Sequence, residues 1–319
     1  FGWLGLILVF PIAGAVLYAL FGVNRVQRKA RRISLEASSG SGLRPAREKA
    51  ADGADPCRPG YHVTHREPAP GHQVGVFFNG EQAYPAMLRA RDEAKRDVLL
   101  SSYIFDHDDS GRQFIERLAA ARARGCDVCV LIDDVGIRYS FPTILRELKR
   151  AELPYRRFMP LRLLPPSFSI NLRTHRKLLI ADRRLVFTGG MNLGERQLVD
   201  GPSPLRASDL HFSFQGPLAA GGVRLFAEDW RFSKGGNLPV WEARQPPAGA
   251  ASCRLIADGP DENLDALMLV IMGAIASARR RVWIMTPYFL PERQMMGCLQ
   301  AAALTGVDVR VMIPARNNW

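Results

Sequence analysis

Short apolar runs alternate with amphipathic segments along the chain from about residue 74 onward. Apolar runs rich in β-branched residues predict buried strands, and apolar residues three and four positions apart predict helices. Strands are expected at residues 97–105, 126–133, 153–158, 211–217, 281–290 and 307–314. Helices are expected at residues 141–151, 222–232, 263–278 and 291–306. A further helix is expected after the first strand, where one apolar stripe is formed by Phe114, Ile115, Leu118 and Ala121. Strands that alternate with helices indicate an α/β sheet with short crossovers.

Two stretches of the chain share one pattern. The first reads AKRDVLLSSYIF, then a helix, then RGCDVCVLID. The second reads ARRRVWIMTPYFL, then a helix, then TGVDVRVMIP. An ordered series of matches of this kind indicates two copies of one domain. We therefore expect a first domain over residues 74–245 and the beginning of a second over residues 246–319.

The first 23 residues contain no charged side chain. At about 1.5 Å per residue, a helix of this length can cross a bilayer core of roughly 30 Å. Five basic residues follow at once: Arg25, Arg28, Lys29, Arg31 and Arg32. A cleaved signal peptide would carry such residues before the apolar stretch, and the positive-inside rule keeps this cluster in the cytoplasm. We expect a transmembrane helix at 1–23, a basic flank and flexible linker at 24–73, and a cytoplasmic catalytic part at the inner membrane.

The net charge of +12 favours anionic partners, which include phospholipid headgroups, nucleic acid and phosphorylated small molecules. The five cysteines are scattered and odd in number, which argues against a disulfide framework. Cys126 and Cys129 lie in a predicted strand, so a buried strand is favoured over a redox or zinc half-site. His62, His65 and His72 lie in the predicted linker, where nothing fixes the geometry of metal ligands. We expect no metal and no cofactor.

Residues 171–182 (NLRTHRKLLIAD) carry the candidate chemistry. On a strand, His175 and Lys177 would point to the same side, because side chains alternate. A neutral imidazole can attack the phosphorus of a phosphodiester, and an ammonium group can offset the charge on its non-bridging oxygens. That ammonium also disfavours protonation of the imidazole. We expect Asp182, at the following turn, to shape the site through hydrogen bonds rather than by touching substrate.

The spacing His-x-Lys-x4-Asp is followed, after one more predicted strand, by Gly-Gly-x-Asn. A small residue such as Gly190 permits close approach of the backbone, and the amide of Asn192 can donate to phosphate. The whole pattern is far more specific than a lone His-x-Lys pair, which usually decorates a surface. It resembles the first HKD motif of the phospholipase D superfamily. Several strings resemble membrane-anchored bacterial cardiolipin synthases: YIFDHDDSG, NLRTHRK, GGMN, SDLHFSFQGP, FAEDW and TPYFLP.

The resemblance implies a phospholipase D-like α/β domain with a mixed β-sheet flanked by helices. It also implies that a phosphatidyl group passes from one phosphatidylglycerol to His175 and then to a second phosphatidylglycerol, with release of glycerol. By its place in SDLHF, Asp209 would orient the nucleophile, and a capping role at the edge of a helix or a strand is the alternative. Asn192, Gly190 and Arg173 would bind substrate. The expected partners are anionic phospholipid and the membrane, without nucleic acid.

A second HKD motif is missing from the sequence. Members of the family use its histidine to protonate the leaving alcohol and to deprotonate the incoming one. His175 lies 72 residues after Tyr103, and the same interval from Tyr288 ends near residue 360, beyond Trp319. Either the chain is a fragment of a longer two-motif enzyme, or two chains each supply one motif across a symmetric homo-oligomer. The start of a second repeat favours the fragment.

Two other functions stay open. The chemistry of the HKD motif does not distinguish water from an alcohol as the acceptor, so a phosphodiesterase or nuclease of the same superfamily is one alternative. A non-catalytic, membrane-tethered module that binds anionic lipid or nucleic acid and retains an inactive half-site is the other.

Overall fold

The computed structural model describes residues 58–64, 67–160, 173–238, 245–257 and 266–315. The described residues between 69 and 255 form one compact unit, and those of 58–68 and 256–315 form a second. None of the helices in these ranges is long and apolar enough to cross a membrane. The predicted transmembrane helix at 1–23 lies outside the described residues.

The first unit is built on a mixed sheet with the strand order β4-β3-β2-β5-β6-β7-β1-β8. Its strands are β1 (Ala69–Phe78), β2 (Asp97–Ser102), β3 (Asp127–Asp133), β4 (Tyr155–Phe158), β5 (Leu178–Ala181), β6 (Leu185–Gly189), β7 (Leu210–Gln215) and β8 (Ala251–Cys253). The pairs β2–β3 and β3–β4 are parallel. The remaining neighbours are antiparallel. This architecture confirms the expected α/β domain with a mixed sheet.

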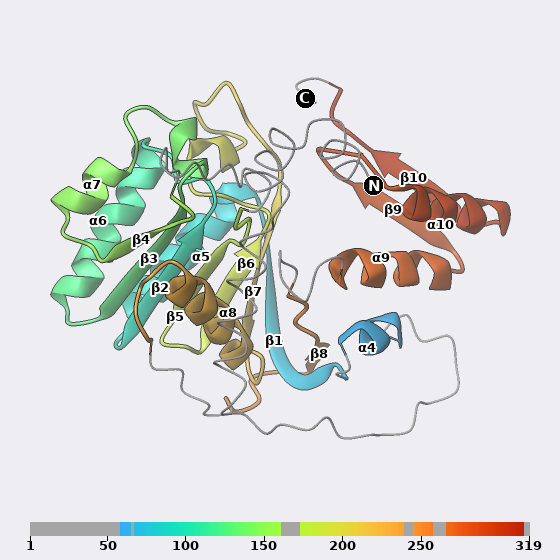
Figure 1. Cartoon of the computed structure of the whole chain (residues 1–319), viewed down its shortest axis with the longest axis horizontal. Helices are drawn as coiled ribbons and strands as arrows, with labels where there is room; N and C mark the ends of the chain where they lie inside the picture. Colours follow the sequence, from blue (N-terminus) through green and yellow to red (C-terminus); the bar gives the residue numbers. More distant parts are fainter. Residues whose placement is uncertain (1–57, 65–66, 161–172, 239–244, 258–265, 316–319) are drawn as a thin grey trace, which may run out of the picture. The chain divides into compact units, whose positions relative to one another are not determined.

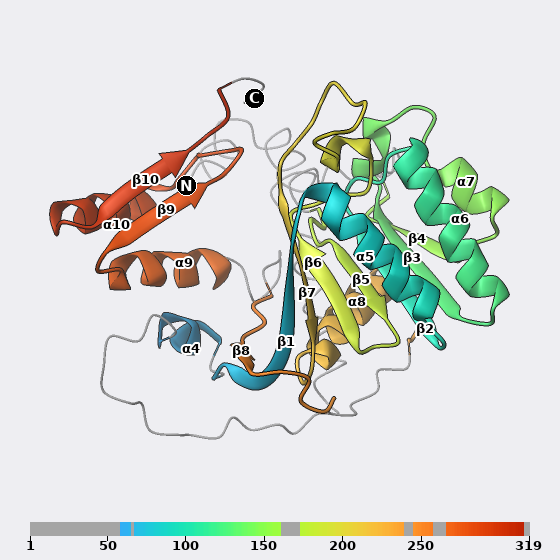
Figure 2. The same cartoon turned by 180° about the vertical axis from the view of Figure 1, so that it is seen from behind.

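Helices cover both faces of the sheet. They are α5 (Asn79–Glu93), α6 (Asp109–Ala123), α7 (Leu145–Arg150) and α8 (Ala219–Phe232), with the 3-10 turns η2 (Gly136–Tyr139) and η3 (Glu195–Gln197). Helices α5 and α6 lie on one face and α8 on the other, as the two opposite views show (Figures 1 and 2). The face under α5 and α6 carries the larger core, which includes Phe105 and Phe114. On the other face, Phe226 and Trp230 of α8 pack against strand residues such as Val186.

Two elements of the first unit differ from the sequence expectation. Strand β1 begins at Ala69, inside the predicted linker, and α5 follows it directly. His72 is a buried residue of β1. Its Nδ1 donates to the carbonyl of Ala251 (3.3 Å), and its Nε2 accepts from the amide of Leu218 (3.0 Å). Both ring nitrogens therefore hold the end of the sheet together, and neither is free for a metal.

The second unit contains α4 (Arg58–Thr64), α9 (Ala266–Ser277), β9 (Arg281–Met285), α10 (Arg293–Leu304) and β10 (Asp308–Met312). Strands β9 and β10 are parallel, as β2 and β3 are in the first unit. The turns that lead into β3 and β10 also match. Gly125 and Gly306 adopt φ values of 93° and 89°. The amide of Asp127 donates to the main-chain carbonyl of Arg96, and the amide of Asp308 donates to that of Arg280. The two β-α-β segments thus share strand pairing and turn geometry.

Candidate active site

The candidate residues gather at one edge of the mixed sheet because of strand direction. Tyr103 follows β2, and Asp133 ends β3, which is parallel to β2. Strand β5 is antiparallel to β2, so Lys177 just before β5 lies at the same edge. Strand β6 ends there before Gly190, and Asp209 precedes the antiparallel β7. Residues as far apart in the sequence as Tyr103 and Asp209 are thereby brought to one site.

His175 stands at this edge beside an aromatic ring. Its imidazole stacks on the ring of Tyr103, with centroids 4.1 Å apart and 19° between the planes. The Nζ of Lys177 lies 5.5 Å from the centroid of the same Tyr103 ring and donates to the main-chain carbonyl of His175 at 2.7 Å. The two residues do not lie on a strand, as the sequence pattern suggested, because β5 begins only at Leu178. They occupy the segment just before it.

Burial, together with the neighbouring charges, favours a neutral imidazole on His175 and brings the pKa of Lys177 close to neutral pH. Partial desolvation and the neighbouring ammonium of Lys177 lower the pKa of His175. Desolvation also lowers the pKa of Lys177 to about 8, against the opposing attraction of Asp209 and Asp133. Near neutral pH this combination provides an unprotonated nucleophile beside a cation.

Buried polar contacts fix the segment in front of His175. Asp133 is fully buried and its carboxylate accepts from the amides of Val135 (2.9 Å) and Thr174 (3.3 Å). The side chain of Arg173 is only 3% exposed and lies 3.9 Å from Asp133. It donates to the carbonyl of Met159 at 2.7 Å. Arg173, predicted to bind substrate, is thus engaged inside the protein.

Arg176 anchors the other side of the same segment. Its guanidinium donates to the carboxylate of Asp229 on α8 at 2.7 Å, and the side chains are 22% and 11% exposed. Ser101 of β2 donates to the carbonyl of Arg176 at 3.4 Å. Sequence reasoning missed both Asp229 and Tyr103 as site residues. The strings FAEDW and YIFDHDDSG contain them, but no spacing rule links either residue to His175.

Asp209 lies against Gly190, the residue that directly follows β6. A Cβ atom added at Gly190 would meet both carboxylate oxygens of Asp209 at 2.4 Å, so only glycine leaves room for this carboxylate. The carboxylate accepts from the amide of Leu210 at 2.7 Å, and the amide of Asp209 donates to the side chain of Asn79 at 3.0 Å. Burial raises the pKa of Asp209, while the Leu210 amide and Lys177 lower it. In the described residues Asp209 makes no hydrogen bond to His175, and its charge acts on Lys177.

His211 is a second histidine near the site and lies next to Gly189. It is 1% exposed, and its Nδ1 would lie 2.8 Å from a Cβ added at Gly189. Burial, with a smaller effect of Lys177, lowers its pKa to about 4. His211 is therefore neutral near pH 7 and lies buried against the backbone of Gly189.

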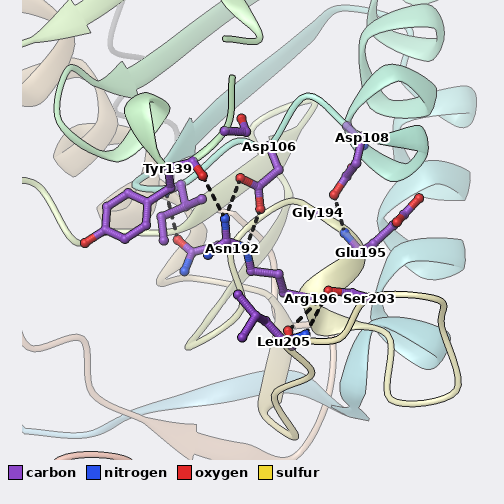
Figure 3. A network of polar contacts seen from close by, with 12 residues as sticks. Asp106, Asp108, Tyr139, Asn192, Gly194, Glu195, Arg196, Ser203 and Leu205 are labelled. Carbon is purple, nitrogen blue, oxygen red and sulfur yellow. Dashed lines mark hydrogen bonds and ion pairs between the residues drawn. The ribbon is translucent and has the colours of Figure 1, made fainter. Parts of the chain in front are cut away.

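Asn192 is held in place by the loop that follows β2. Its side-chain oxygen accepts from the amide of Ile104 at 3.0 Å, and its carbonyl accepts from the hydroxyl of Tyr84 at 2.9 Å. Asp106, further along this loop, pairs at 2.9 Å with the guanidinium of Arg196 from η3, which also donates to the carbonyl of Tyr139 at 3.1 Å (Figure 3). The oxygen of Asn192 is thus used internally, which orients the amide NH2 as its remaining donor.

Asp182 lies at the opposite edge of the sheet. One of its carboxylate oxygens accepts from the amides of Lys95 (3.1 Å), Arg96 (2.7 Å) and Asp97 (3.2 Å) at the start of β2. Asp182 and Arg183 have φ values of 52° and 58°, a left-handed turn that non-glycine residues adopt at a cost. The three hydrogen bonds offset that cost. Asp182 therefore stabilises β2 and the β5–β6 turn at a distance from His175.

The arrangement suits nucleophilic chemistry on a phosphodiester. An exposed, neutral imidazole is stacked on Tyr103, an ammonium group lies beside it, and a carboxylate and a glycine turn complete the edge. Among the described residues, no group of three or more His, Cys, Asp or Glu side chains is placed to hold a metal ion. A neutral imidazole can act as a nucleophile, and an ammonium group can offset negative charge on a phosphate.

Comparison with known families shows the family of the chain. The family model described as "Cardiolipin synthase, PLD-like domain", where PLD denotes phospholipase D, matches residues 87–201 and 271–319. The chain belongs to this family. Its matched segments include the HKD motif and the second of the two β-α-β segments.

Individual proteins of the cardiolipin synthase family are similar over most of the chain. Cardiolipin synthase of Geobacillus kaustophilus (strain HTA426) is 30% identical over 98% of this chain and 65% of its own length. Cardiolipin synthase A of Pseudomonas putida is 34% identical over 77% of this chain and 51% of its own length. The chain thus spans about half to two thirds of these curated relatives.

A solved structure shows the same fold. The crystal structure of phosphatidylserine synthase from Haemophilus influenzae Rd KW20 superposes with a TM-score of 0.57 and 13% identity. The superposition covers 81% of this chain and 66% of that chain. At this identity, the similarity is evidence for the fold alone.

Proposed function

We propose that this protein is part of a cardiolipin synthase that transfers a phosphatidyl group between two phosphatidylglycerol molecules. The observation that carries the proposal is the stacking of His175 on the Tyr103 ring, with the ammonium of Lys177 near the same ring and hydrogen-bonded to the His175 carbonyl. The 30% identity to the Geobacillus kaustophilus enzyme supports the substrate class. The exposed imidazole leaves access for a lipid headgroup.

In the first step, a ring nitrogen of neutral His175 attacks the phosphorus of one phosphatidylglycerol. The phosphorus–oxygen bond to the glycerol headgroup breaks, and glycerol leaves with a proton from a general acid. Lys177 offsets charge on the non-bridging oxygens, and Asn192 donates to one of them through its NH2 group. In the second step, a hydroxyl of another phosphatidylglycerol gives its proton to the same group, now acting as a base, and attacks the phosphohistidine; the phosphorus–nitrogen bond breaks, which restores His175 and yields cardiolipin.

The other site residues have supporting roles in this proposal. Asp209 balances the charge of Lys177, and Gly190 leaves space for that carboxylate. Arg173 positions the nucleophile segment through Asp133, and Asp182 stabilises the fold of the motif. The general acid is assigned to the histidine of a second HKD motif, supplied by a longer chain or by a second subunit.

We further propose that the protein has a second domain and a membrane anchor. The matching strand pairing and turns of residues 281–312 support the start of a second phospholipase D-like domain there. Residues 1–23 would anchor the protein in the inner membrane, and the basic cluster that follows would keep the site on the cytoplasmic side. Phosphatidylglycerol in the inner leaflet would then be within reach of His175.

Labelled phosphatidylglycerol tests the proposal in membranes that contain the full-length protein. We expect cardiolipin and free glycerol, and acid-labile, base-stable label on the protein as phosphohistidine. His175→Ala should abolish both product and protein label, whereas His62→Ala, at a histidine of the second unit, should change neither. Phosphatidic acid without cardiolipin would instead assign water as the acceptor. Full activity of His175→Ala would exclude the proposed nucleophile and favour a binding module.

A further inference from the structure

Three large apolar side chains project into solvent from two loops at the catalytic edge. Tyr139 is 54% exposed, Phe141 is 98% exposed and Leu205 is 55% exposed. Tyr139 and Phe141 lie on the loop after β3, and Leu205 lies on the loop before β7. We call these three residues the apolar rim. Exposure of this extent is unfavourable in water, so a clustered set indicates a surface that something covers.

Direct contacts join the two loops of the apolar rim. The guanidinium of Arg196 lies over the ring of Tyr139, 5.8 Å from its centroid, and donates to the Tyr139 carbonyl at 3.1 Å. The carbonyl of Arg196 accepts from the amide of Ala207, two residues after Leu205, at 2.8 Å. Figure 3 shows Arg196 in contact with Tyr139 on one side and with Asp106 on the other. The rim is therefore a supported edge of the fold.

The apolar rim is also connected to the nucleophile. The ring of Tyr139 meets the ring of Tyr103 edge-on, with centroids 6.2 Å apart, and Tyr103 stacks on His175. A phospholipid that reacts at His175 must bring its acyl chains to the immediate surroundings of the phosphodiester. An apolar surface that begins at the stacked rings is placed to receive them.

Charge on the apolar rim favours an anionic surface. Exposed arginines adjoin its residues in sequence: Arg138 precedes Tyr139, and Arg206 follows Leu205. Two carboxylates behind the rim are buried and paired, since Asp134 binds Arg138 at 3.2 Å and Asp106 binds Arg196 at 2.9 Å. Aromatic and aliphatic tips flanked by arginines are typical of segments that enter the interface of an anionic bilayer.

We propose that the apolar rim inserts into the surface of an anionic phospholipid bilayer and so presents lipid headgroups to His175. The proposal rests on the function proposed above, which it extends from the reacting group to the lipid surface. It commits to a bilayer as the occupant, because a membrane supplies the apolar layer and the negative charge together. Contact of the rim with another protein copy is the competing outcome of the test.

The kinetic test compares two substrates of the full-length enzyme. One is phosphatidylglycerol in vesicles with an equal part of phosphatidylcholine, and the other is dibutyryl phosphatidylglycerol, which dissolves as monomers. The variant Phe141→Ser/Leu205→Ser should lower the ratio of the vesicle rate to the monomer rate about tenfold. The control Leu304→Ser, at an 89% exposed leucine of α10, should leave this ratio unchanged. An unchanged ratio in the double variant would overturn the proposal, as would a lower ratio accompanied by loss of a dimer in sedimentation.

A binding test measures insertion of the apolar rim into a bilayer independently of catalysis. Phe141→Trp in the full-length protein should gain tryptophan fluorescence that is quenched by vesicles of the same composition with brominated acyl chains. Leu304→Trp should gain fluorescence that is not quenched. Equal quenching of the two variants would overturn the proposal. Because this readout requires no turnover, an enzyme without transferase activity would contradict the proposed function while leaving the insertion result intact.

Discussion

The imidazole of His175 stacks on the ring of Tyr103 with centroids 4.1 Å apart. The tyrosine follows the end of β2, while the histidine precedes β5, and these two strands are antiparallel neighbours. The stack therefore closes the gap between two strand ends and limits the orientations that the exposed imidazole can adopt. Desolvation raises the pKa of the Tyr103 hydroxyl to about 12, so the ring is uncharged during turnover.

Removal of this ring should slow the enzyme without abolishing activity. An aromatic pair contributes about 0.5–1.5 kcal/mol beyond burial, so Tyr103→Leu should lower kcat by about three- to tenfold. Tyr103→Phe keeps the stack and should retain most of the wild-type rate. Steady-state kinetics on vesicles that contain phosphatidylglycerol measure both variants. An equal loss in the Phe variant would show that the hydroxyl, rather than the ring, is required.

The pH profile should report the two shifted groups. The His175 imidazole must be neutral to attack, and its lowered pKa places the rising limb of kcat/KM below the ordinary value of about 6.5. The Lys177 pKa of about 8 predicts a falling limb near that pH, where the ammonium loses its proton. Lys177→Arg should move this falling limb to higher pH, since guanidinium stays charged. A falling limb that stays near pH 8 in this variant would assign it to another group.

A methyl group at Gly190 should displace the carboxylate of Asp209. The added Cβ would lie 2.4 Å from both carboxylate oxygens, so Gly190→Ala should lower kcat/KM about tenfold or more. Gly297→Ala is the matched control, because a Cβ there meets nothing within 4 Å and the site is a helix interior. Its activity should stay at the wild-type level. A fully active Gly190→Ala enzyme would show that the position of Asp209 is unimportant.

The ion pair between Arg176 and Asp229 should couple α8 to the nucleophile segment. Both side chains are largely buried, so a double-mutant cycle with Arg176→Met and Asp229→Asn should give a coupling free energy of about 1–3 kcal/mol. Urea denaturation measures it. The exposed pair Arg112 and Asp109 serves as the control and should give about 0.5 kcal/mol or less. Similar coupling in both pairs would contradict an anchoring role for Asp229.

Loss of Asp182 should affect stability more than chemistry. Asp182→Ala removes the acceptor for the three amides of residues 95–97 and should destabilise the fold by about 2 kcal/mol. Asp182→Asn keeps an acceptor and a residue that tolerates positive φ, so it should lose less. Thermal midpoints and kcat together separate the two effects. A large loss of kcat at an unchanged midpoint would place Asp182 in the chemistry instead.

Some elements and site residues could be predicted from the sequence and others could not, and the difference has physical reasons. Strand β2 is buried on both faces and reads as a continuous apolar run, so its prediction was confirmed. Strand β1 mixes buried and exposed residues, and its first five residues fall within the predicted linker. His175 and Lys177 were found because they lie within one short motif. Tyr103 and Asp229 were missed because their contacts with this motif depend on strand order and helix docking.

The pairing of β1 with β7 also orders events during synthesis. Asn79, which directly follows β1, accepts a hydrogen bond from the amide of Asp209, 130 residues later in the chain. A ribosome therefore completes the nucleophile segment before Asp209 and the following strand β7 emerge, and until then β6 has an open edge. Open strand edges recruit other chains. Addition of β7 between β6 and β1 both closes that open edge and places Asp209 among the residues around His175.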